Sequence, residues 1–594
     1  MIDSKHPELG ELPVWDLTDL YPSRDSAELK RDMEESAKAG KAFRTAYEGK
    51  LAGLDGATLG KAVTEYERME ETLSRLMTFA YLTYSTAVND PATGKFYQEM
   101  KEQVTEISTD LLFFTLELNR IEDAALEEKL KAPALAKYQP WLRDLRVSRP
   151  HQLSDELETY IHETSVVADA AWVRLFDETL SSLRFTVNGE EMGEPEVLNL
   201  MRSPDRAVRQ AAGQELARVF GSNIQLFSLI TNTLAKSKEI DDKWRKFKAP
   251  QSSRNLANLI EDEVVDALHS AVKNAYPRLS HRYYAMKAKW LGLDKMEYWD
   301  RGAPLPGETQ RIIPWAEEQE IVLKAYASFE PELARLGQPF FTKGWIDAAV
   351  KEGKEPGAYS HPAVPSVHPY ILMNYLGKDR DVMTLAHELG HGVHQVLASE
   401  QGQLISDTPL TLAETASVFG EMLTFRSLLS SEKDPQQRKI LLASKVEDML
   451  STVVRQIAFY EFELKVHTER RKGELLPERI GEIWMEVQTA SLGPTFTFRP
   501  EYSCFWTYIP HFIHSAFYVY AYAFGDCLVN ALYATYQAQP EGFAAKYMEM
   551  LKAGGRHRHK ELLAPFGLDA TDPAFWQRGI SVVERLIDEL EALS

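Results

Sequence analysis

Apolar and charged residues alternate at helical spacing along most of this chain. The apolar positions recur three or four residues apart, which is the pattern of helices that bury one face. Prolines are scarce inside these runs and fall between them, where helices end. The pattern predicts helices over residues 28–47, 56–87, 92–118, 124–130, 155–183, 204–238, 264–290, 315–336 and 438–471. We therefore expect a mainly α fold without internal repeats.

One short stretch departs from the helical pattern. Between Arg184 and Glu191 an Asn-Gly pair gives the turn signal of a β-hairpin. The chain of 594 residues is long enough for more than one domain. We place a boundary near residue 200, after the hairpin and Pro195. It separates a helical N-terminal region, residues 1–200, from a second region, residues 201–594.

The segment His387-Glu388-Leu389-Gly390-His391 carries the most specific chemistry in the sequence. Acidic residues before it and apolar residues at helical spacing after it predict a helix. Histidines four apart on a helix are turned by about 40° and displaced by about 6 Å, so their imidazoles converge on one point. Glu388 cannot join that pair, but it can reach the water or substrate side of a bound metal. The alternative is a buried helix whose histidines only make core hydrogen bonds.

A third metal ligand is expected from another element. Glu414, 23 residues after His391, is the best-placed candidate. Zinc in hydrolases takes three protein ligands and keeps an open position, and it lowers the pKa of bound water to about 7. Gly390 and Gly392 are poor helix formers, so we expect another element to pack closely against the backbone there. The sequence therefore predicts a catalytic zinc site.

The segment just before this helix, residues 357–375, is rich in proline, aromatic residues and short apolar runs. This composition favours strands and loops. A strand here has two possible roles. It presents a free edge beside the metal, with which an extended peptide pairs through main-chain hydrogen bonds. Alternatively, it belongs to an ordinary small sheet that supports the helix.

Composition and charge restrict the partners and the compartment. The net charge of −21, from 67 basic and 88 acidic residues, argues against nucleic acid and anionic membranes. Cys504 and Cys527 cannot form a disulfide framework and belong to no Cys-x-x-Cys pair, so we expect two buried thiols in a reducing compartment. The N-terminus from Met1 to Pro7 lacks the features of a signal peptide. We expect a cytoplasmic protein.

Residues 512–536 contain no lysine or arginine, and their only acidic residue is Asp526. The stretch is long enough to span a bilayer. However, it includes polar side chains such as His514 and Asn530, and its tyrosines are spread along it instead of marking two interfaces. We expect a buried helix that lines a polar site, and no membrane association.

These motifs resemble those of peptidase family M3, most closely of its oligoendopeptidase F branch. The residues that carry the resemblance are 386–394, 414–421, 509–512 and 517–520, with supporting matches at 12–17, 344–347 and 572–576. The similarity therefore runs nearly end to end. It implies a mainly α, clam- or channel-shaped enzyme with one zinc ion, a small β-sheet near the active site and activity on short peptides. The region 201–594 would be catalytic.

The resemblance assigns roles to individual residues. It implies that the zinc ligands are His387, His391 and Glu414 and that the general base is Glu388. Glu421 follows Glu414 by seven residues and therefore shares its helix face. We expect Glu421 either to orient a ligand histidine or to be an ordinary solvated or salt-bridged carboxylate.

The C-terminal motif supplies candidates for stabilising an oxyanion. His511, His514, Tyr518 and Tyr522 recur at intervals of three or four, so they share a face if this stretch is helical. The resemblance points to His511, Tyr518 and Tyr522 as the donors, and such a donor contributes about 3 kcal/mol. Tyr520 fits one alignment equally well.

Several other positions keep alternatives open. His394 returns to the helix face of His391, and the resemblance favours a supporting or substrate-binding role over metal ligation. His361 and His368 are expected to be loop histidines. Ala516 stands where relatives often carry proline, and the basic residues 556–560 replace a less basic loop. We expect this cluster to be solvated, with contact to a peptide carboxylate as the alternative.

The sequence therefore predicts a zinc-dependent oligoendopeptidase that hydrolyses internal bonds of short unstructured peptides, with Glu388 as the base that activates water. Two alternatives stay open: a zinc carboxypeptidase that releases dipeptides, and a weakly active peptide-binding protein that uses the same cleft. Retention of Glu388 speaks against the second alternative. The sequence gives neither the cleavage preference nor the oligomeric state.

Overall fold

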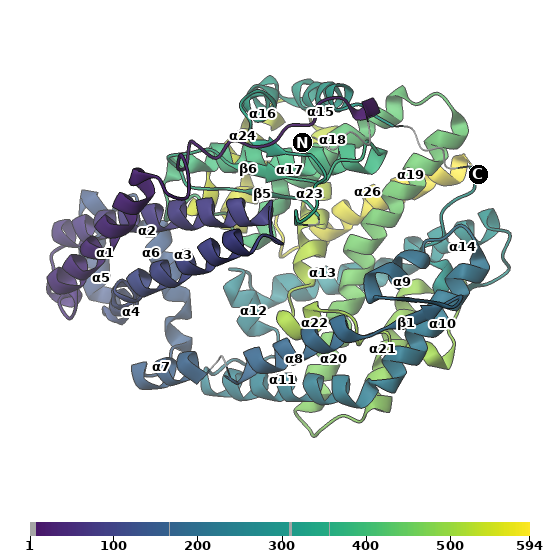
Figure 1. Ribbon diagram of the computed structural model, residues 1–594, viewed down its shortest axis with the longest axis horizontal. Coiled ribbons are helices and arrows are strands. Elements are labelled where there is room, and N and C mark those ends of the chain that lie inside the picture. Colours follow the sequence, from purple (N-terminus) through teal and green to yellow (C-terminus); the bar gives the residue numbers. More distant parts are fainter. Residues whose placement is uncertain (1–6, 165–166, 308–311, 356, 594) are drawn as a thin grey trace. The chain divides into compact units, whose positions relative to one another are not determined.

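The computed structural model describes residues 7–164, 167–307, 312–355 and 357–593. Most of these residues lie in helices. Within these ranges the strands are short and form three small sheets. Figure 1 accordingly shows many coiled ribbons and few arrows. The predicted mainly α fold is confirmed.

The chain forms two compact units, and each unit is assembled from three segments. The first unit comprises Met1–Arg149, Gln310–Ser431 and Thr535–Gly567, and the second comprises Pro150–Thr309, Glu432–Ala534 and Leu568–Ser594. The units therefore do not follow the order of the sequence. The division at residue 200 stays a prediction about regions of sequence.

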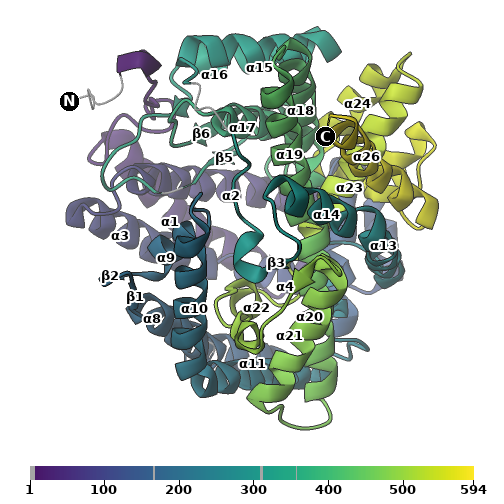
Figure 2. The same cartoon turned by 90° about the vertical axis from the view of Figure 1, so that its right-hand side faces the viewer.

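The first unit contains the helix with the histidine motif and the helices packed on it. In its described part the α-helices are α1 (Ala27–Tyr47), α2 (Gly56–Ser85), α3 (Pro91–Thr109), α4 (Leu112–Arg120), α5 (Asp123–Leu130), α6 (Gln139–Leu145), α15 (Trp315–Phe329), α16 (Pro331–Thr342), α17 (Asp379–Ala398), α18 (Leu410–Ser431), α24 (Phe543–Lys552) and α25 (His559–Leu563). Both views show α15, α16 and α18 beside α17, the motif helix (Figures 1 and 2).

The second unit is also built from helices. In its described part they are α7 (Asp155–Thr164), α8 (Asp169–Ser182), α9 (Glu194–Leu200), α10 (Arg206–Ser222), α11 (Ile224–Trp244), α12 (Ser252–Ala257), α13 (Asp262–Ala275), α14 (Ser280–Trp290), α19 (Pro435–Met449), α20 (Gln456–Arg470), α21 (Pro477–Leu492), α22 (His511–His514), most of α23 (Tyr520–Ala538) and α26 (Pro573–Ala592). Its longer helices bury apolar faces; α26, for example, buries Trp576, Ile580 and Leu586 completely.

Several predicted helices are each divided into two. The pattern over 92–118, 155–183, 204–238, 264–290 and 315–336 was continuous, but each range contains a break. Pro331 begins α16 and Pro277 lies between α13 and α14, where the missing N–H of proline stops the preceding helix. At the end of α10 the Asn223 side chain donates to the Val219 carbonyl at 2.9 Å. Apolar periodicity continues across such breaks because both helices face one core.

The prediction over 438–471 was more accurate, since α19 and α20 form one continuous helical run. They are joined by the π-helical turn Leu450–Arg455.

Residues 357–375 form strands and loops, as predicted. The strands β4 (Ile346–Asp347), β5 (Tyr359–His361) and β6 (Tyr370–Leu372) form a sheet in the order β4-β6-β5. The central strand β6 is parallel to β4 and antiparallel to β5, with Ser360 opposite Ile371. Strand β5 is therefore an edge strand, and it packs on α17.

The other two sheets have two strands each. The predicted hairpin is confirmed: β1 (Phe185–Val187) and β2 (Glu190–Met192) are antiparallel. Asn188 and Gly189 form its turn with φ angles of 54° and 88°, which asparagine and glycine tolerate best. The strands β3 (Met296–Glu297) and β7 (Phe496–Thr497) pair in parallel.

The apolar stretch 512–536 is largely buried within the fold. Among the described residues no helix combines the length and apolar character needed to cross a membrane.

Candidate metal centre

Two close-packed helices, α17 and α18, hold the candidate metal ligands. A Cβ atom on Gly390 would lie 2.5 Å from the Ala416 carbonyl oxygen, and one on Gly392 would lie 2.6 Å from the Phe340 ring. Both positions therefore require glycine, as the sequence predicted. The close approach sets α18, which carries Glu414, directly against the histidine helix.

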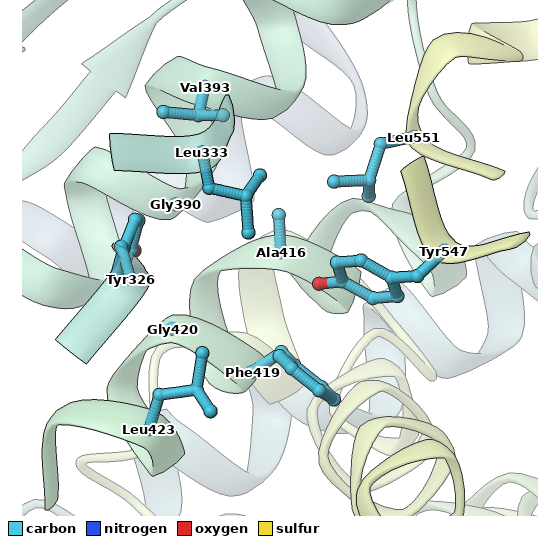
Figure 3. Close-up of a pocket in the computed structure, with 10 residues that line it drawn as sticks. All are labelled: Tyr326, Leu333, Gly390, Val393, Ala416, Phe419, Gly420, Leu423, Tyr547 and Leu551. Carbon is cyan, nitrogen blue, oxygen red and sulfur yellow. The ribbon is translucent and has the colours of Figure 1, made fainter. Parts of the chain in front are cut away.

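A small apolar pocket lies along the seam between α17 and α18, and Figure 3 shows its lining. Its only side-chain hydroxyls belong to Tyr326 and Tyr547. They donate to helix carbonyls: Tyr326 to Ala386 at 2.5 Å and Tyr547 to Thr415 at 2.8 Å. The pocket thus presents packing surface and fastens the two ligand helices.

The three predicted metal ligands converge. Nε2 of His387 lies 3.3 Å from Glu414 Oε2, and Nε2 of His391 lies 3.5 Å from the same oxygen. One ligand atom from each residue falls within 4.8 Å of the others, and no other such group of histidine, cysteine and acidic residues occurs in the described part of the chain.

The donor set fits zinc. A tetrahedral ion with ligand bonds of about 2.1 Å separates its ligand atoms by about 3.4 Å. The distances from His387 Nε2 and His391 Nε2 to Glu414 Oε2, 3.3 Å and 3.5 Å, match this separation. Two imidazoles and one carboxylate also form a ligand set of catalytic zinc sites, which leaves a fourth position open.

Neighbouring side chains hold the ligands in place. Glu421 Oε2 lies 3.3 Å from His387 Nδ1, which favours the orienting role of Glu421 over that of an ordinary solvated carboxylate. Ser417 Oγ donates to Glu414 Oε2 at 2.7 Å. Sequence reasoning missed Ser417, although its position three residues after Glu414 on the same helix was an available signal.

The protonation of this cluster follows from burial and from its carboxylates. Burial favours neutral His387, but the hydrogen bond that His387 donates to Glu421 and the charges of Glu414 and Glu388 outweigh burial and raise the pKa of His387 to about 9. Burial lowers the pKa of His391 to about 4. The surrounding carboxylates thus favour a positive charge at the point where the ligands meet, which suits a metal cation.

Glu388 stands apart from the ligands. It is 7% exposed, and burial raises its pKa to about 7 against the opposing charge of His387. The Ser360 backbone on β5 also interacts with its carboxylate. On the same strand, Gln395 Nε2 donates to the Ser360 carbonyl at 3.2 Å. Strand β5 is therefore fastened to α17 at Ser360, as expected of a supporting sheet. No sequence pattern pointed to Gln395.

The other histidines near the motif do not join the cluster. His394 is 5% exposed, its pKa is lowered to about 4 by burial, and its Nε2 faces the Thr408 hydroxyl at 3.5 Å. His361 Nδ1 accepts from the Ala363 N–H at 3.0 Å. His368 stacks on Trp345 and lies 3.0 Å from Asp19.

In the second unit, His511, Tyr518 and Tyr522 lie together. His511 Nε2 is 3.2 Å from Tyr522 Oη, and the Tyr518 ring centre lies 6.1 Å from that of His511 and 5.4 Å from that of Tyr522. They do not share one helix, however. Helix α22 ends at His514, α23 begins at Tyr520, and Phe517 between them has φ 59°.

Two residues of the expected helix face lie elsewhere. His514 Nε2 pairs with Asp177 at 2.7 Å. Tyr520 is fully buried, and its hydroxyl accepts from Asn258 Nδ2 at 2.8 Å. The break at Phe517 turns His514 and Tyr520 away from the cluster.

The basic segment 556–560 is only partly solvated. Arg558 pairs with Asp144 at 2.6 Å, and His559 is buried, whereas Arg556 and Lys560 are exposed. The expectation of a wholly solvated loop was therefore wrong for Arg558 and His559.

Two family models match the chain. The model of peptidase family M3 matches residues 316–582, and the model described as oligopeptidase F matches residues 117–185. The first range includes the candidate ligands, Glu388, and the segment from His511 to Tyr522.

Bacterial peptidases are similar to the chain over nearly its whole length. Oligopeptidase PepF of Bacillus subtilis is 29% identical over 600 residues, which cover 98% of this chain and 87% of PepF. Group B oligopeptidase PepB of Streptococcus agalactiae is 27% identical, with 98% of this chain and 96% of PepB covered.

Solved structures share the fold. Oligoendopeptidase-F from Enterococcus faecium superposes with a TM-score of 0.71 at 24% identity, covering 95% of this chain and 97% of that one. A crystallised Chlamydophila abortus protein described as a peptidase gives a TM-score of 0.86 at 24% identity, with 98% of both chains covered.

Proposed function

Because this chain belongs to peptidase family M3, in its oligopeptidase F branch, we propose that it is a zinc-dependent oligoendopeptidase that cleaves internal bonds of short unstructured peptides. The observation that carries the proposal is the convergence of His387, His391 and Glu414, whose ligand atoms lie within 4.8 Å of one another, with Glu388 beside them and outside the ligand set. A peptide bond requires an activated water and a proton donor for the leaving amine, and this arrangement supplies both.

Three residues would hold the metal in this proposal. His387 and His391 each offer Nε2 and Glu414 offers Oε2. When bound, zinc would polarise the scissile carbonyl and lower the pKa of a water molecule to about 7. Glu421 keeps His387 in the orientation that presents Nε2, and Ser417 fixes the Glu414 carboxylate.

Glu388 moves the proton. It follows His387 directly, so its side chain projects from an adjacent face of the helix and stays free of the metal. As general base, its carboxylate takes a proton from the attacking water. As general acid, it then returns that proton to the nitrogen of the leaving amine.

His511, Tyr518 and Tyr522 stabilise the oxyanion in this proposal. Their mutual contacts in the second unit and the resemblance to the family motif support a shared role. A hydroxyl or imidazole N–H that donates to the developing negative charge lowers the barrier by about 3 kcal/mol. Within the cluster His511 orients the Tyr522 hydroxyl.

The substrate of the proposed reaction is an extended peptide. Strand β5 lies at the edge of its sheet and beside Glu388, which supports peptide binding along it. Gln395 donates to the Ser360 carbonyl, so a peptide that pairs with strand β5 at Ser360 would have to displace this side chain. The two free, buried cysteines fit the expected cytoplasmic location.

Product mapping tests the proposal. The full chain is incubated with a mixture of unstructured peptides and with one stably folded protein, and products are identified by mass spectrometry. We expect zinc-dependent cuts at internal bonds of the peptides and no digestion of the folded protein. Stepwise release of dipeptides from the C-terminus would identify a carboxypeptidase instead. Binding without cleavage would identify a peptide-binding protein.

A further inference from the structure

Two arginines of the second unit, Arg301 and Arg455, lie near Tyr508. Arg455 Nη2 lies 3.4 Å from Tyr508 Oη, and Arg301 is close enough to the same side chain to interact with it electrostatically. All three residues are partly exposed to solvent. Two positively charged side chains therefore lie near one tyrosine hydroxyl.

Within the described part of the chain, Arg301 and Arg455 lack carboxylate partners, in contrast to the basic residues near them. Arg209 Nη2 lies 3.0 Å from Asp300 Oδ1, and Lys287 pairs with Glu447. Among the described residues, neither guanidinium of the Tyr508 pair has a carboxylate within 4.0 Å. Like charges side by side disfavour each other, and partly burying an uncompensated charge is costly. A bound anion removes both costs.

The surroundings of the pair are aromatic. The Arg455 guanidinium carbon lies 4.9 Å from the centre of the Phe459 ring, and Tyr284 and Tyr502 lie near Arg301. Arg455 Nε is buried and has no hydrogen-bond partner among the described residues. Each guanidinium carries five N–H donors in a planar fork, which matches the two oxygens of a carboxylate.

The backbone gives a second sign of a ligand site at Arg455. This residue ends the π-helical turn Leu450–Arg455, which interrupts the hydrogen bonding of the otherwise continuous α19–α20 run. Such turns are rare and occur frequently at functional sites. Arg455, the last residue of this turn, is the residue that contacts Tyr508.

Arg455 also lies close to His511 in the same unit. Burial, then the charges of His514 and Arg455, lower the pKa of His511. Tyr508 precedes His511 by three residues. The arginine pair therefore adjoins the cluster that the proposed function assigns to the scissile bond.

We propose that Arg301, Arg455 and Tyr508 bind a carboxylate of the peptide substrate. This inference rests on the proposed peptidase function. The carboxylate is either the C-terminus of the peptide or an aspartate or glutamate side chain, since both present the same two oxygens.

Peptide binding to the full chain carrying Glu388→Gln tests the site without consuming the probe. Three otherwise matched peptides, each with a neutral dye at the N-terminus, differ only in their carboxylates. The first has a free C-terminus and no acidic residue, the second is its amide, and the third is the amide with one glutamate. Fluorescence anisotropy gives the Kd of each peptide for the protein, for its Arg301→Gln and Arg455→Gln variants, and for Arg174→Gln as an exposed control.

We expect at least one carboxylate peptide to bind about tenfold more tightly than the plain amide. Preference for the first peptide identifies the C-terminus, and preference for the third identifies a side chain. The preference should vanish in both arginine variants and persist in Arg174→Gln. Equal binding or non-binding of all three peptides, or a preference that survives both substitutions, overturns the proposal.

The peptide comparison needs no arginine variant, so it stays decisive if a variant fails to fold. Arg455→Lys then adds a milder change: it keeps the charge but loses the planar fork, and should keep only part of the preference. The binding assay also does not depend on turnover. Failure of the carboxylate preference therefore overturns this site alone, whereas absence of hydrolysis by the unsubstituted chain overturns the proposed function.

Discussion

Glu421 Oε2 lies 3.3 Å from Nδ1 of His387, while Nε2 of the same ring lies 3.3 Å from Glu414 Oε2. The two nitrogens of one imidazole thus face two carboxylates from α18. A carboxylate at Nδ1 keeps the proton on that nitrogen and leaves Nε2 for a metal. Helix α18 therefore carries both the proposed ligand Glu414 and the carboxylate that faces the proposed ligand His387 of α17.

This relationship predicts a weaker metal site in a Glu421→Gln variant. The amide loses the negative charge that stabilises the oriented ring, so zinc affinity should fall by about 10- to 100-fold. Competition with a chromophoric chelator measures it. Glu400→Gln, at an exposed position just after α17, is the matched control and should keep the original affinity. Unchanged affinity in Glu421→Gln would show that Glu421 does not orient the ligand.

The assignment of the third ligand is tested by Glu414→Ala. The purified protein should hold about one zinc ion per chain, and removal of the carboxylate should abolish most of that occupancy. Elemental analysis after dialysis gives the metal content directly. Full occupancy in the variant would remove Glu414 from the ligand set, and Glu421 would then be the first substitute to examine.

The tyrosines of the second unit differ in their expected kinetic effects. Tyr518→Phe removes a hydroxyl but keeps the ring, so kcat should fall by about 10²-fold while KM changes little. Tyr520→Phe is the matched control, because the Tyr520 hydroxyl is buried against Asn258. It should leave kcat near its original value. A large loss for Tyr520→Phe with none for Tyr518→Phe would contradict the assignment.

A buried carboxyl group predicts a pH dependence of stability. Glu463 is 2% exposed, its Oε1 accepts the Phe517 N–H at 2.8 Å, and burial raises its pKa to about 8. The folded protein therefore holds this proton more tightly than the unfolded chain, whose glutamates titrate near pH 4.3. The contribution to stability is complete below that pH and is lost as the pH rises to about 8.

Glu463→Gln should remove this dependence, because the amide keeps the hydrogen bond to Phe517 but does not titrate. Thermal unfolding at about pH 5.5 and about pH 8.5 measures the effect. The unsubstituted protein should lose more stability between the two values than the variant does. Glu400→Gln serves again as the exposed control. Parallel losses in Glu463→Gln and the unsubstituted protein would rule out the buried titration.

Local sequence patterns were sufficient for the convergence of the candidate ligands and for the mainly α class, but not for the breaks within five of the predicted helices. The spacing of His387 and His391 and the position of Glu414 on the next long helix determine their convergence. The glycines of α17 were correctly expected to allow close packing. The alternative roles of Glu421 were separated only by the structure, since a shared helix face does not tell which neighbour it meets.

Tertiary contacts explain the features that the sequence patterns did not predict. No glycine or proline marks the left-handed Phe517, whose conformation is stabilised by the distant Glu463, so the break between α22 and α23 could not be predicted. His394 shares the face of His391 yet turns to Thr408. Arg301 and Arg455 are far apart in sequence, and no local pattern brings them to Tyr508.

Zinc content and peptidase rate, measured together in a Glu388→Gln variant, test the central claim most directly. The amide keeps the shape of Glu388 but cannot accept a proton, and Glu388 is not a ligand. The account predicts that zinc stays near one ion per chain while the rate on an unstructured peptide falls by at least ~10²-fold. An unchanged rate with zinc still bound would contradict it.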